Sequence, residues 1–211
     1  KLQRSGLFEE IWIQPAAGDA GGAIGAALAA HHIFLNNQKE KNTTDRMKGA
    51  FLGPEFSNRE ILKTLTKYQA VAILESDFDA LCEKVAFQLA EGKIIGWFQG
   101  RMEFGPRALG NRSILADARN REMQKRLNLQ IKFREGFRPF APAVLWENTS
   151  DYFDIDCPSP YMLMVCPVKK EKQKELPDGY DQLPLLEKLY TERSDVPAVT
   201  HIDYSVRVQT V

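Results

Sequence analysis

The stretch WFQGRMEFGPRALGNRS, residues 97–113, combines residue types that suit the binding of an anion, and we term it the arginine loop. Three arginines in it alternate with three glycines: Arg101, Arg107 and Arg112 with Gly100, Gly105 and Gly110. Arginine offers phosphate planar, permanently charged, bidentate donors, and glycine lets backbone N–H groups approach the anion. Because the stretch directly follows an apolar segment, where α/β proteins place their ligands, we expect it to bind phosphate.

The arginine loop is not a Walker A loop. Gly100 and Gly105 have the required spacing, but Pro106 and Arg107 stand where that motif needs lysine and then serine or threonine. The alternative to phosphate binding is a solvated basic turn. We favour polyphosphate binding, since exposed arginines rarely come with so many glycines and aromatic residues around them.

A second basic loop, IKFREGFRPFAP, covers residues 131–142. Its cations are interleaved with aromatic rings: Lys132, Arg134 and Arg138 with Phe133, Phe137 and Phe140. An extended segment would place the cations on one face and the rings on the other, although Gly136 breaks strict alternation. The rings suit a hydrophobic core, a bound nucleotide or single-stranded RNA, and composition alone leaves these three readings open.

A glycine-rich turn, PAAGDAGG, opens an Ala-rich helical pattern near the start of the chain. Such a turn suits phosphate at the helix N-terminus and tight packing equally well. Asp19 within it is either a helix cap or a ligand, because it is an acid among small residues.

The last segment with candidate polar residues is THIDYSVRVQTV, at the end of the chain. His201, Asp203 and Arg207 alternate along an expected strand, so they could face one cleft. The alternative is a structural role, which is the more common one for a single histidine in a strand.

Composition bounds the remaining possibilities. The chain of 211 residues suits one domain, or one domain and a fragment, and its 28 basic and 28 acidic residues give no overall signal for nucleic acid or membrane. Residues 101–138 nevertheless hold ten Lys/Arg against four Asp/Glu, a local excess that points to an anionic ligand. Three scattered cysteines, no signal peptide and no apolar run of about 18 residues indicate a cytoplasmic protein. Since the chain starts without methionine and stops in a strand pattern, we expect a fragment of a longer protein.

Apolar periodicity predicts strands interleaved with helices, and hence an α/β fold. The expected strands are residues 7–13, 93–98, 113–116, 141–146, 161–166 and 206–211. The expected helices follow the PAAGDAGG turn, begin at capping boxes formed by Ser57 with Glu60 and by Ser76 with Asp79, and cover residues 119–129. Gly92 is expected to close the Ser76 helix. We interpret residues 36–58 as a linker and residues 168–195 as a surface excursion.

Taken together, four segments in this order and spacing closely resemble the O-carbamoyltransferases of the nodulation, cephamycin and tobramycin type: PAAGDAGGAIGAAL, GRMEFGPRALGNRSILADAR, IKFREGFRPFAP and PAVTHIDYSVRVQTV. The resemblance spans nearly the whole chain and implies two catalytic domains. Residues 1–35 would be the helical remnant of an actin/hexokinase-like carbamoyl-transfer domain, and residues 36–58 a linker. Residues 59–211 would be a YrdC-like domain, a twisted mixed sheet with flanking helices, truncated at its C-terminus.

The same resemblance implies a reaction. The YrdC-like domain would form carbamoyl adenylate from carbamoyl phosphate and ATP with Mg²⁺, and the other domain would transfer the carbamoyl group to a hydroxyl of a small-molecule acceptor. It assigns catalytic roles to four cations, Arg101 and Arg107 on carbamoyl phosphate and Lys132 and Arg134 on the adenylate. It assigns nucleotide contacts to Gly18, Gly21, Asn111, Arg112, Arg138, His201 and Arg207.

The resemblance also matches Asp19 to a ligand of iron or another divalent metal, whose histidine ligands would lie upstream. The chain departs from the family pattern at Tyr204, where the family carries a glycine. Two other functions remain open. A threonylcarbamoyl-adenylate synthase of tRNA modification would use bicarbonate and threonine, but such enzymes lack the domain that PAAGDAGG belongs to. An RNA-binding module would use the basic segment 101–138, but the balanced total charge disfavours it.

Overall fold

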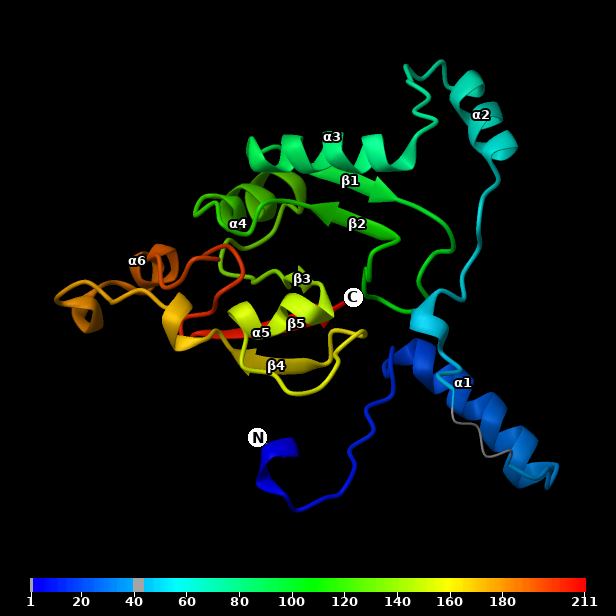
Figure 1. Ribbon diagram of the computed structural model, residues 1–211. Coiled ribbons are helices and arrows are strands. Elements are labelled where there is room, and N and C mark those ends of the chain that lie inside the picture. Colours follow the sequence, from blue (N-terminus) through cyan, green and yellow to red (C-terminus); the bar gives the residue numbers. More distant parts are fainter. Residues whose placement is uncertain (1, 40–43) are drawn as a thin grey trace.

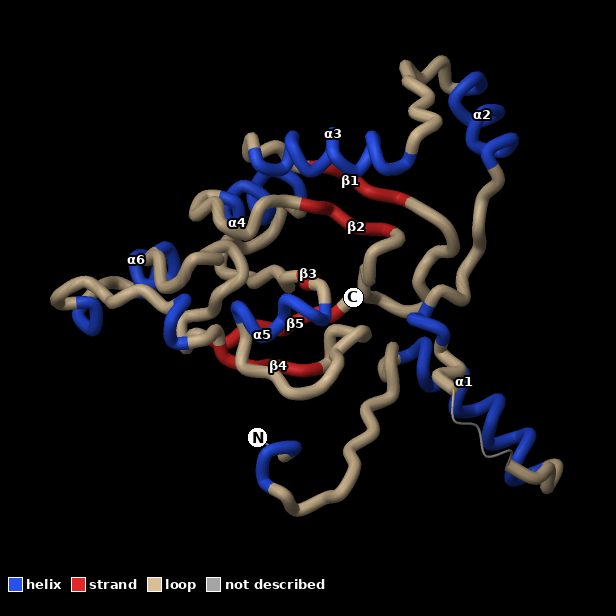
Figure 2. Tube along the Cα trace, viewed as in Figure 1, coloured by secondary structure: helices blue, strands red, loops and turns tan. Residues whose placement is uncertain are grey.

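The computed structural model describes residues 2–39 and 44–211, which form two small sheets with helices around them (Figure 1). In the first sheet, β1 (Ile95–Phe98) pairs antiparallel with β2 (Arg112–Leu115), so that Ile95 faces Leu115 and Phe98 faces Arg112. The arginine loop connects these two strands as irregular chain (Figure 2). The pairing explains the position of the loop, because a hairpin brings the two ends of its connection together.

The second sheet has the strand order β3-β5-β4 and mixed direction. The central strand β5 (Ser205–Thr210) runs parallel to β3 (Ala143–Val144) and antiparallel to β4 (Met164–Pro167). The α/β fold class is therefore confirmed, and the expected strands near residues 95, 113, 143, 164 and 206 are all present. The YrdC-like arrangement stays a prediction.

The larger hydrophobic cluster lies on one face of β5. Val206 and Val208 are fully buried and pack with Phe153, Cys166 and Val168, among others. Since successive side chains of a strand point to opposite faces, this burial puts Arg207 and Gln209 on the other face of β5. The core thus orients one arginine of the predicted site.

A second, smaller cluster joins the two sheets. It contains Met123, Leu127 and Ala198, with Ile114 of β2 and Phe140 packed against it. Phe140 also packs against the larger cluster. One ring of the second basic loop is therefore core, which was one of the three readings left open for the rings.

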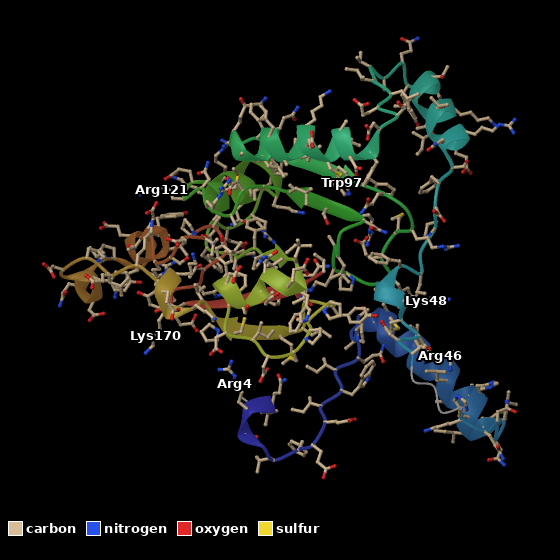
Figure 3. All side chains as sticks on the ribbon, in the orientation of Figure 1. Arg4, Arg46, Lys48, Trp97, Arg121 and Lys170 are labelled. Atoms are coloured by element: carbon tan, nitrogen blue, oxygen red, sulfur yellow. The ribbon has the colours of Figure 1, made fainter. Side chains whose placement is uncertain are left out.

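Helix α3 (Phe78–Ala90) lies along the β1–β2 sheet (Figure 1). Trp97 of β1 lies near the N-terminal end of α3, with the ring of Phe78 at 6.3 Å in an edge-on arrangement (Figure 3). The helix cap is Asp77, whose carboxylate accepts hydrogen bonds from the backbone N–H groups of Asp79 and Ala80. The predicted capping box at Ser76 was therefore wrong by one residue, and Gly92, with φ +78°, ends the helix as expected.

Helix α2 (Asn58–Lys67) begins at the predicted capping box. The Ser57 hydroxyl accepts from the Glu60 N–H, and the Glu60 carboxylate accepts from the Ser57 N–H at 2.8 Å. The hydrogen bonds to Ser57 lower the pKa of Glu60. This helix was predictable because its start depends on four neighbouring residues alone.

Helix α1 (Asp19–Ala29) follows the PAAGDAGG turn and continues as a π-helical turn, Ala30–Phe34. The predicted strand at residues 7–13 was wrong, since that segment is exposed, irregular chain without a partner strand in the described part of the molecule. A strand needs backbone partners, and an apolar pattern does not supply them. The helix was correct because its hydrogen bonds are internal.

The remaining helical pieces are short. They are the 3-10 turns Gln3–Ser5, Lys48–Ala50, Trp146–Asn148, Lys170–Lys172 and Tyr180–Gln182, the helices α4 (Met123–Arg126), α5 (Thr149–Tyr152) and α6 (Leu185–Tyr190), and the π-helical turn Leu127–Ile131. The predicted helix 119–129 is thus shifted toward its C-terminal half. The predicted surface excursion 168–195 is not wholly on the surface, because Val168, Arg193 and Ser194 are buried.

Candidate functional site

Arg107 and Arg207 are the two cations of the arginine loop and β5 that the fold brings together. The Arg207 Nε is buried and has no hydrogen-bond partner in the part of the chain that the structure describes. Burial, and next the positive charge of Arg107, lower the pKa of Arg207. Within residues 2–39 and 44–211, the exposed Arg107 has no carboxylate within ion-pair distance. Two neighbouring guanidinium groups without a counter-charge are suited to an anion.

A buried hydrogen bond ties the arginine loop to the strand of Arg207. The side-chain amide of Gln209 donates to the Leu109 carbonyl at 2.8 Å, across 100 residues of sequence. Leu109 and Gln209 are both buried, and Gln209 shares its face of β5 with Arg207. This contact therefore fixes the loop on the same side of the strand as the Arg207 guanidinium.

Glu103 holds the arginine loop from within. Its side chain is fully buried, and its Oε1 accepts from the backbone N–H groups of Leu109, Asn111 and Arg112 at 2.7, 2.8 and 3.2 Å. The other oxygen, Oε2, accepts from the Arg112 Nε at 2.9 Å. Burial alone would raise the pKa of Glu103, but the hydrogen bonds from Leu109, Arg112 and Asn111 prevail and hold it at about 2.

This carboxylate is the residue that reasoning from the sequence missed. The one available signal was its type, since Glu103 is the only acid between the three arginines of the loop. The Arg112 guanidinium also donates to the Glu103 carbonyl at 3.0 Å, so the geometry gives Arg112 an internal partner. Asn111 likewise donates from its side chain to the Arg101 carbonyl at 2.7 Å.

The predicted linker contributes to the site. The Gly53 N–H donates to the Met102 carbonyl and the Met102 N–H to the Pro54 carbonyl, both at 2.9 Å. The Arg101 guanidinium donates to the Gly53 carbonyl at 2.8 Å and lies 3.7 Å from a Glu55 carboxylate oxygen. The segment around Gly53 thus fixes Arg101, whose side chain is about half exposed.

The turn before α1 packs against the arginine loop. A Cβ on Gly105, whose φ is +98°, would lie 2.4 Å from the Ala16 Cβ, and a Cβ on Gly21 would lie 2.5 Å from the Ala16 carbonyl oxygen. Figure 1 shows the loop reaching the start of α1. Close packing against Ala16 therefore accounts for both glycines. For Gly21 in the PAAGDAGG turn, packing was the alternative to phosphate binding.

Gly18 and Asp19 stand at the start of α1. Gly18 is the N-cap residue, and the exposed Asp19 is the first residue of the helix. In the ranges 2–39 and 44–211, no group of three or more His, Cys, Asp and Glu side chains could hold a metal ion. One exposed carboxylate does not make a metal site, so the described residues do not by themselves fit the metal that Asp19 was matched to.

The second basic loop is organised by Asn128, which is completely buried. Its side chain donates to the carbonyls of Gly136 and Arg138 at 3.1 and 2.8 Å and accepts from the Arg134 Nε at 2.7 Å. The Arg134 guanidinium lies 5.1 Å from the centre of the Phe140 ring. The loop turns back on itself, so it does not have the extended form that would place its cations on one face.

The other two cations of this loop are on the surface. Lys132 is exposed at the end of the π-helical turn, and Arg138 pairs with Glu135 at 2.9 Å with both side chains about half exposed. Among the described residues, no hydrogen bond links Lys132, Arg134 or Arg138 to Arg107 or Arg207. The structure therefore presents two cationic groups, one centred on each loop.

His201 and Asp203 lie in a turn before β5, so the predicted alternation along one strand was wrong. The Tyr204 N–H donates to the His201 carbonyl at 3.0 Å, and Asp203 accepts from the N–H and hydroxyl of Ser205 at 3.0 and 2.7 Å. Tyr204 has φ +61°. It therefore keeps the left-handed conformation that glycine adopts most readily, at the position where the resemblance led us to expect a glycine.

Two hollows of the surface lie elsewhere. One of about 490 Å³ is lined by Arg121 and by residues in and beside α6, such as Tyr190, and one of about 690 Å³ by Arg59, Lys63 and Lys67 on α2. Neither is lined by any of the cations or glycines considered above. The candidate site is therefore defined by charge and hydrogen bonding. None of the helices in the described ranges is both long enough and apolar enough to cross a bilayer.

Comparison with protein families gives two matches. The model described as "Carbamoyltransferase C-terminus" matches residues 86–211, and the one described as "Carbamoyltransferase N-terminus" matches residues 1–28. The first match covers more than half of the chain and contains both basic loops and Arg207. The second contains the turn before α1 that packs on the arginine loop.

Curated relatives match over the whole chain. An uncharacterized protein of Synechocystis is 56% identical over 100% of this chain and 34% of its own length. The nodulation protein NolO of Bradyrhizobium diazoefficiens is 38% identical over 100% of this chain and 35% of its own length. A nodulation protein U of Rhizobium tropici is 34% identical over 100% and 30%. The chain thus spans about a third of the length of these relatives.

Proposed function

The chain belongs to the carbamoyltransferase family, and from this membership we propose that it is the carbamoyl-adenylate-forming part of an ATP-dependent O-carbamoyltransferase. The observation that supports this proposal best is the pair of Arg107 and Arg207. Both guanidinium groups lack an acidic partner in the described part of the chain, and the Nε of Arg207 is buried without an acceptor. A site that leaves a buried charged donor unpaired is suited to an anionic substrate that would pair it.

The proposed chemistry matches such a site. Water cleaves carbamoyl phosphate into carbamate and phosphate. A carbamate oxygen then attacks the α-phosphorus of ATP, the bond from this phosphorus to the bridging oxygen breaks, and pyrophosphate leaves with the electron pair. Carbamoyl phosphate, carbamate, ATP and pyrophosphate are all anions, so positioning and charge neutralisation supply most of the catalysis and no nucleophilic side chain is required.

Each cation has a role in this proposal. Arg107 and Arg207 bind the phosphate of carbamoyl phosphate, with Arg101 at the edge of the same site. Lys132 and Arg134 of the second loop bind the adenylate. Asn111, Arg112, Arg138 and His201 complete the nucleotide contacts, with Arg112 acting from its place beside Glu103. Mg²⁺ would arrive with the phosphates of ATP, which normally supply several of its ligands.

Residues 1–35 are, in this proposal, the end of an actin/hexokinase-like domain that carries out the second half-reaction, and Gly18 and Gly21 contact nucleotide there. A hydroxyl of a small-molecule acceptor attacks the carbamoyl carbon, and AMP leaves. Residues 36–58 link that domain to the YrdC-like domain, residues 59–211. The metal site matched to Asp19 needs ligands that the described residues do not offer, and no step is assigned to it.

The proposal is tested by exchange of labelled pyrophosphate into ATP with the intact protein. We expect exchange that depends on carbamoyl phosphate, because pyrophosphate release is reversible once carbamate has been captured. Absent exchange, or exchange indifferent to carbamoyl phosphate, would refute the proposal. Exchange that needs threonine and bicarbonate would indicate a threonylcarbamoyl-adenylate synthase. RNA binding with a steep salt dependence and without nucleotide turnover would indicate an RNA-binding module.

A further inference from the structure

We infer that Glu103 and Gln209 are positioning residues that hold Arg107 against Arg207, so that the anion site exists before the anion arrives. The inference rests on the proposed function for its substrate. The positioning joint, by which we mean the hydrogen bonds of Glu103 and Gln209 to Leu109, rests on the geometry alone. Both side chains bind the backbone of one residue, because the Leu109 N–H donates to Glu103 and the Leu109 carbonyl accepts from Gln209.

The need for such a joint follows from charge. Arg107 and Arg207 repel each other, and in the described chain neither of them forms an ion pair with a carboxylate. A flexible loop would relieve this repulsion by moving Arg107 away from β5, since glycine-rich segments rearrange at little cost. An anion would then have to order the loop on binding, and its affinity would be lower by that cost.

Glu103 prevents this movement by closing the loop. Its carboxylate receives N–H groups from both sides of Gly110, at Leu109 and at Asn111, together with Arg112. Arg107 consequently lies on a short arm, residues 104–108, which is fixed at Glu103 on one side and at Leu109 on the other. The arm also rests on the Ala16 turn through Gly105.

Gln209 then fixes this closed loop on β5, the strand that carries Arg207. It is two residues from Arg207 and on the same face of β5, so its hydrogen bond of 2.8 Å to Leu109 places the arm of Arg107 beside the Arg207 side chain. Because Leu109 and Gln209 are both buried, water cannot replace this hydrogen bond easily.

The test measures binding of inorganic pyrophosphate and of carbamoyl phosphate to the intact protein by calorimetry. Two substitutions weaken the joint. Glu103→Gln places an amide N–H donor where the carboxylate accepted hydrogen bonds, so that donor faces donor, for example at the Arg112 Nε. Gln209→Leu removes the donor to the Leu109 carbonyl. We expect each to raise the Kd for pyrophosphate about fivefold or more. The control Glu122→Gln changes an exposed partner of Arg121 and should leave the Kd unchanged.

A double-mutant cycle separates positioning from general stability. If Glu103 and Gln209 act through Arg107, the same substitutions should change the Kd less than about twofold in an Arg107→Ala background. An unchanged Kd in the single variants, or an equal loss with and without Arg107, would overturn the inference. Should Glu103→Gln fail to fold, the Gln209→Leu cycle decides alone.

The failure of this inference can be told apart from a failure of the proposed function. Wild-type protein that binds pyrophosphate and shows the coupling, but has no carbamoyl-phosphate-dependent exchange, keeps the positioning joint and rejects the proposed reaction. Wild-type protein that binds neither anion rejects both. Exchange in the wild type with unaltered Kd in every variant rejects the joint alone.

Discussion

Arg193 and Arg207 both have buried guanidinium atoms, but of these two side chains only that of Arg193 has hydrogen-bond acceptors among the described residues. Arg193 is 2% exposed and donates to the carbonyls of Lys188, Leu189, Thr200 and His201. Arg207 has a buried Nε with no acceptor and faces the charge of Arg107. A buried charge is normally paired, so the two arginines should respond in opposite ways to removal of the charge.

Arg207→Met should weaken anion binding without loss of stability. The substitution removes a buried donor that lacks a partner and a cation that a neighbour repels, while a side chain of similar length remains. We expect the free energy of unfolding without ligand to stay unchanged or to rise by about 1 kcal/mol. Denaturant unfolding and pyrophosphate titration measure the two effects. A less stable variant with unchanged affinity would show that Arg207 is structural.

Arg193→Met is the matched comparison and should do the reverse. It leaves four buried or partly buried carbonyls without their donors, in the segment that packs against the turn before β5. We expect a loss of about 3 kcal/mol or more in the free energy of unfolding. Pyrophosphate affinity of the folded fraction should be unaffected, which titration well below the melting temperature would check. Wild-type stability would contradict this assignment.

Arg107→Ala should abolish carbamoyl-phosphate-dependent pyrophosphate exchange and leave the fold intact. Arg107 is exposed and makes no hydrogen bond to another described residue, so its removal costs no packing, whereas a guanidinium on a transferring group contributes several kcal/mol to catalysis. Arg121→Ala, an exposed arginine of the same basic segment, is the control and should keep full activity. An active Arg107→Ala variant would remove Arg107 from the proposed site.

What could be predicted from the sequence is what depends on neighbouring residues. The capping box of Ser57 and Glu60 and the helix end at Gly92 were correct because both depend on short segments. The cap of α3 was missed by one residue, since Ser76 and Asp77 are both good caps and only the chain path selects Asp77. The arginine loop was recognised from its residue types for the same local reason.

The parts that failed depend on distant residues. The apolar pattern of residues 7–13 predicts a strand, but no described strand lies beside it. The role of Glu103 requires knowledge that the loop closes on it, and the contact of Leu109 with Gln209 spans 100 residues. These contacts bring Arg107 close to Arg207. Neither the closeness of the two side chains nor their repulsion could therefore be predicted from the motifs.

Tyr204 offers a test of the turn before β5, where the resemblance led us to expect a glycine. Its φ of +61° costs little for glycine and asparagine, more for tyrosine and most for a β-branched residue. We therefore expect Tyr204→Val to be less stable than Tyr204→Asn by about 1 kcal/mol or more, although both lose the hydrogen bond from the tyrosine hydroxyl to Lys174. Equal stability of the two variants in urea unfolding would show that the turn is not left-handed in solution.

Glu103 predicts how the protein responds to acid. In the folded state burial would raise its pKa, yet the hydrogen bonds from Leu109, Arg112 and Asn111 hold it at about 2, below the ordinary value of 4.5. Because the folded pKa is the lower one, the ionised carboxylate stabilises the fold fully above pH 4.5. This stabilisation is lost as the pH falls from 4.5 to about 2.

The size of the effect makes it measurable against the other carboxylates. The lowered pKa corresponds to about 3 kcal/mol, since the side chain is fully buried and solvent does not screen it. Glu103→Gln should therefore be less stable than the wild type at neutral pH but lose about 3 kcal/mol less between pH 5.5 and pH 2. The exposed control Glu122→Gln should keep the wild-type slope. If Glu103→Gln loses stability as steeply as the wild type, the carboxylate is not the anchor of the arginine loop, because an anchor that depends on ionisation must fail when it is protonated.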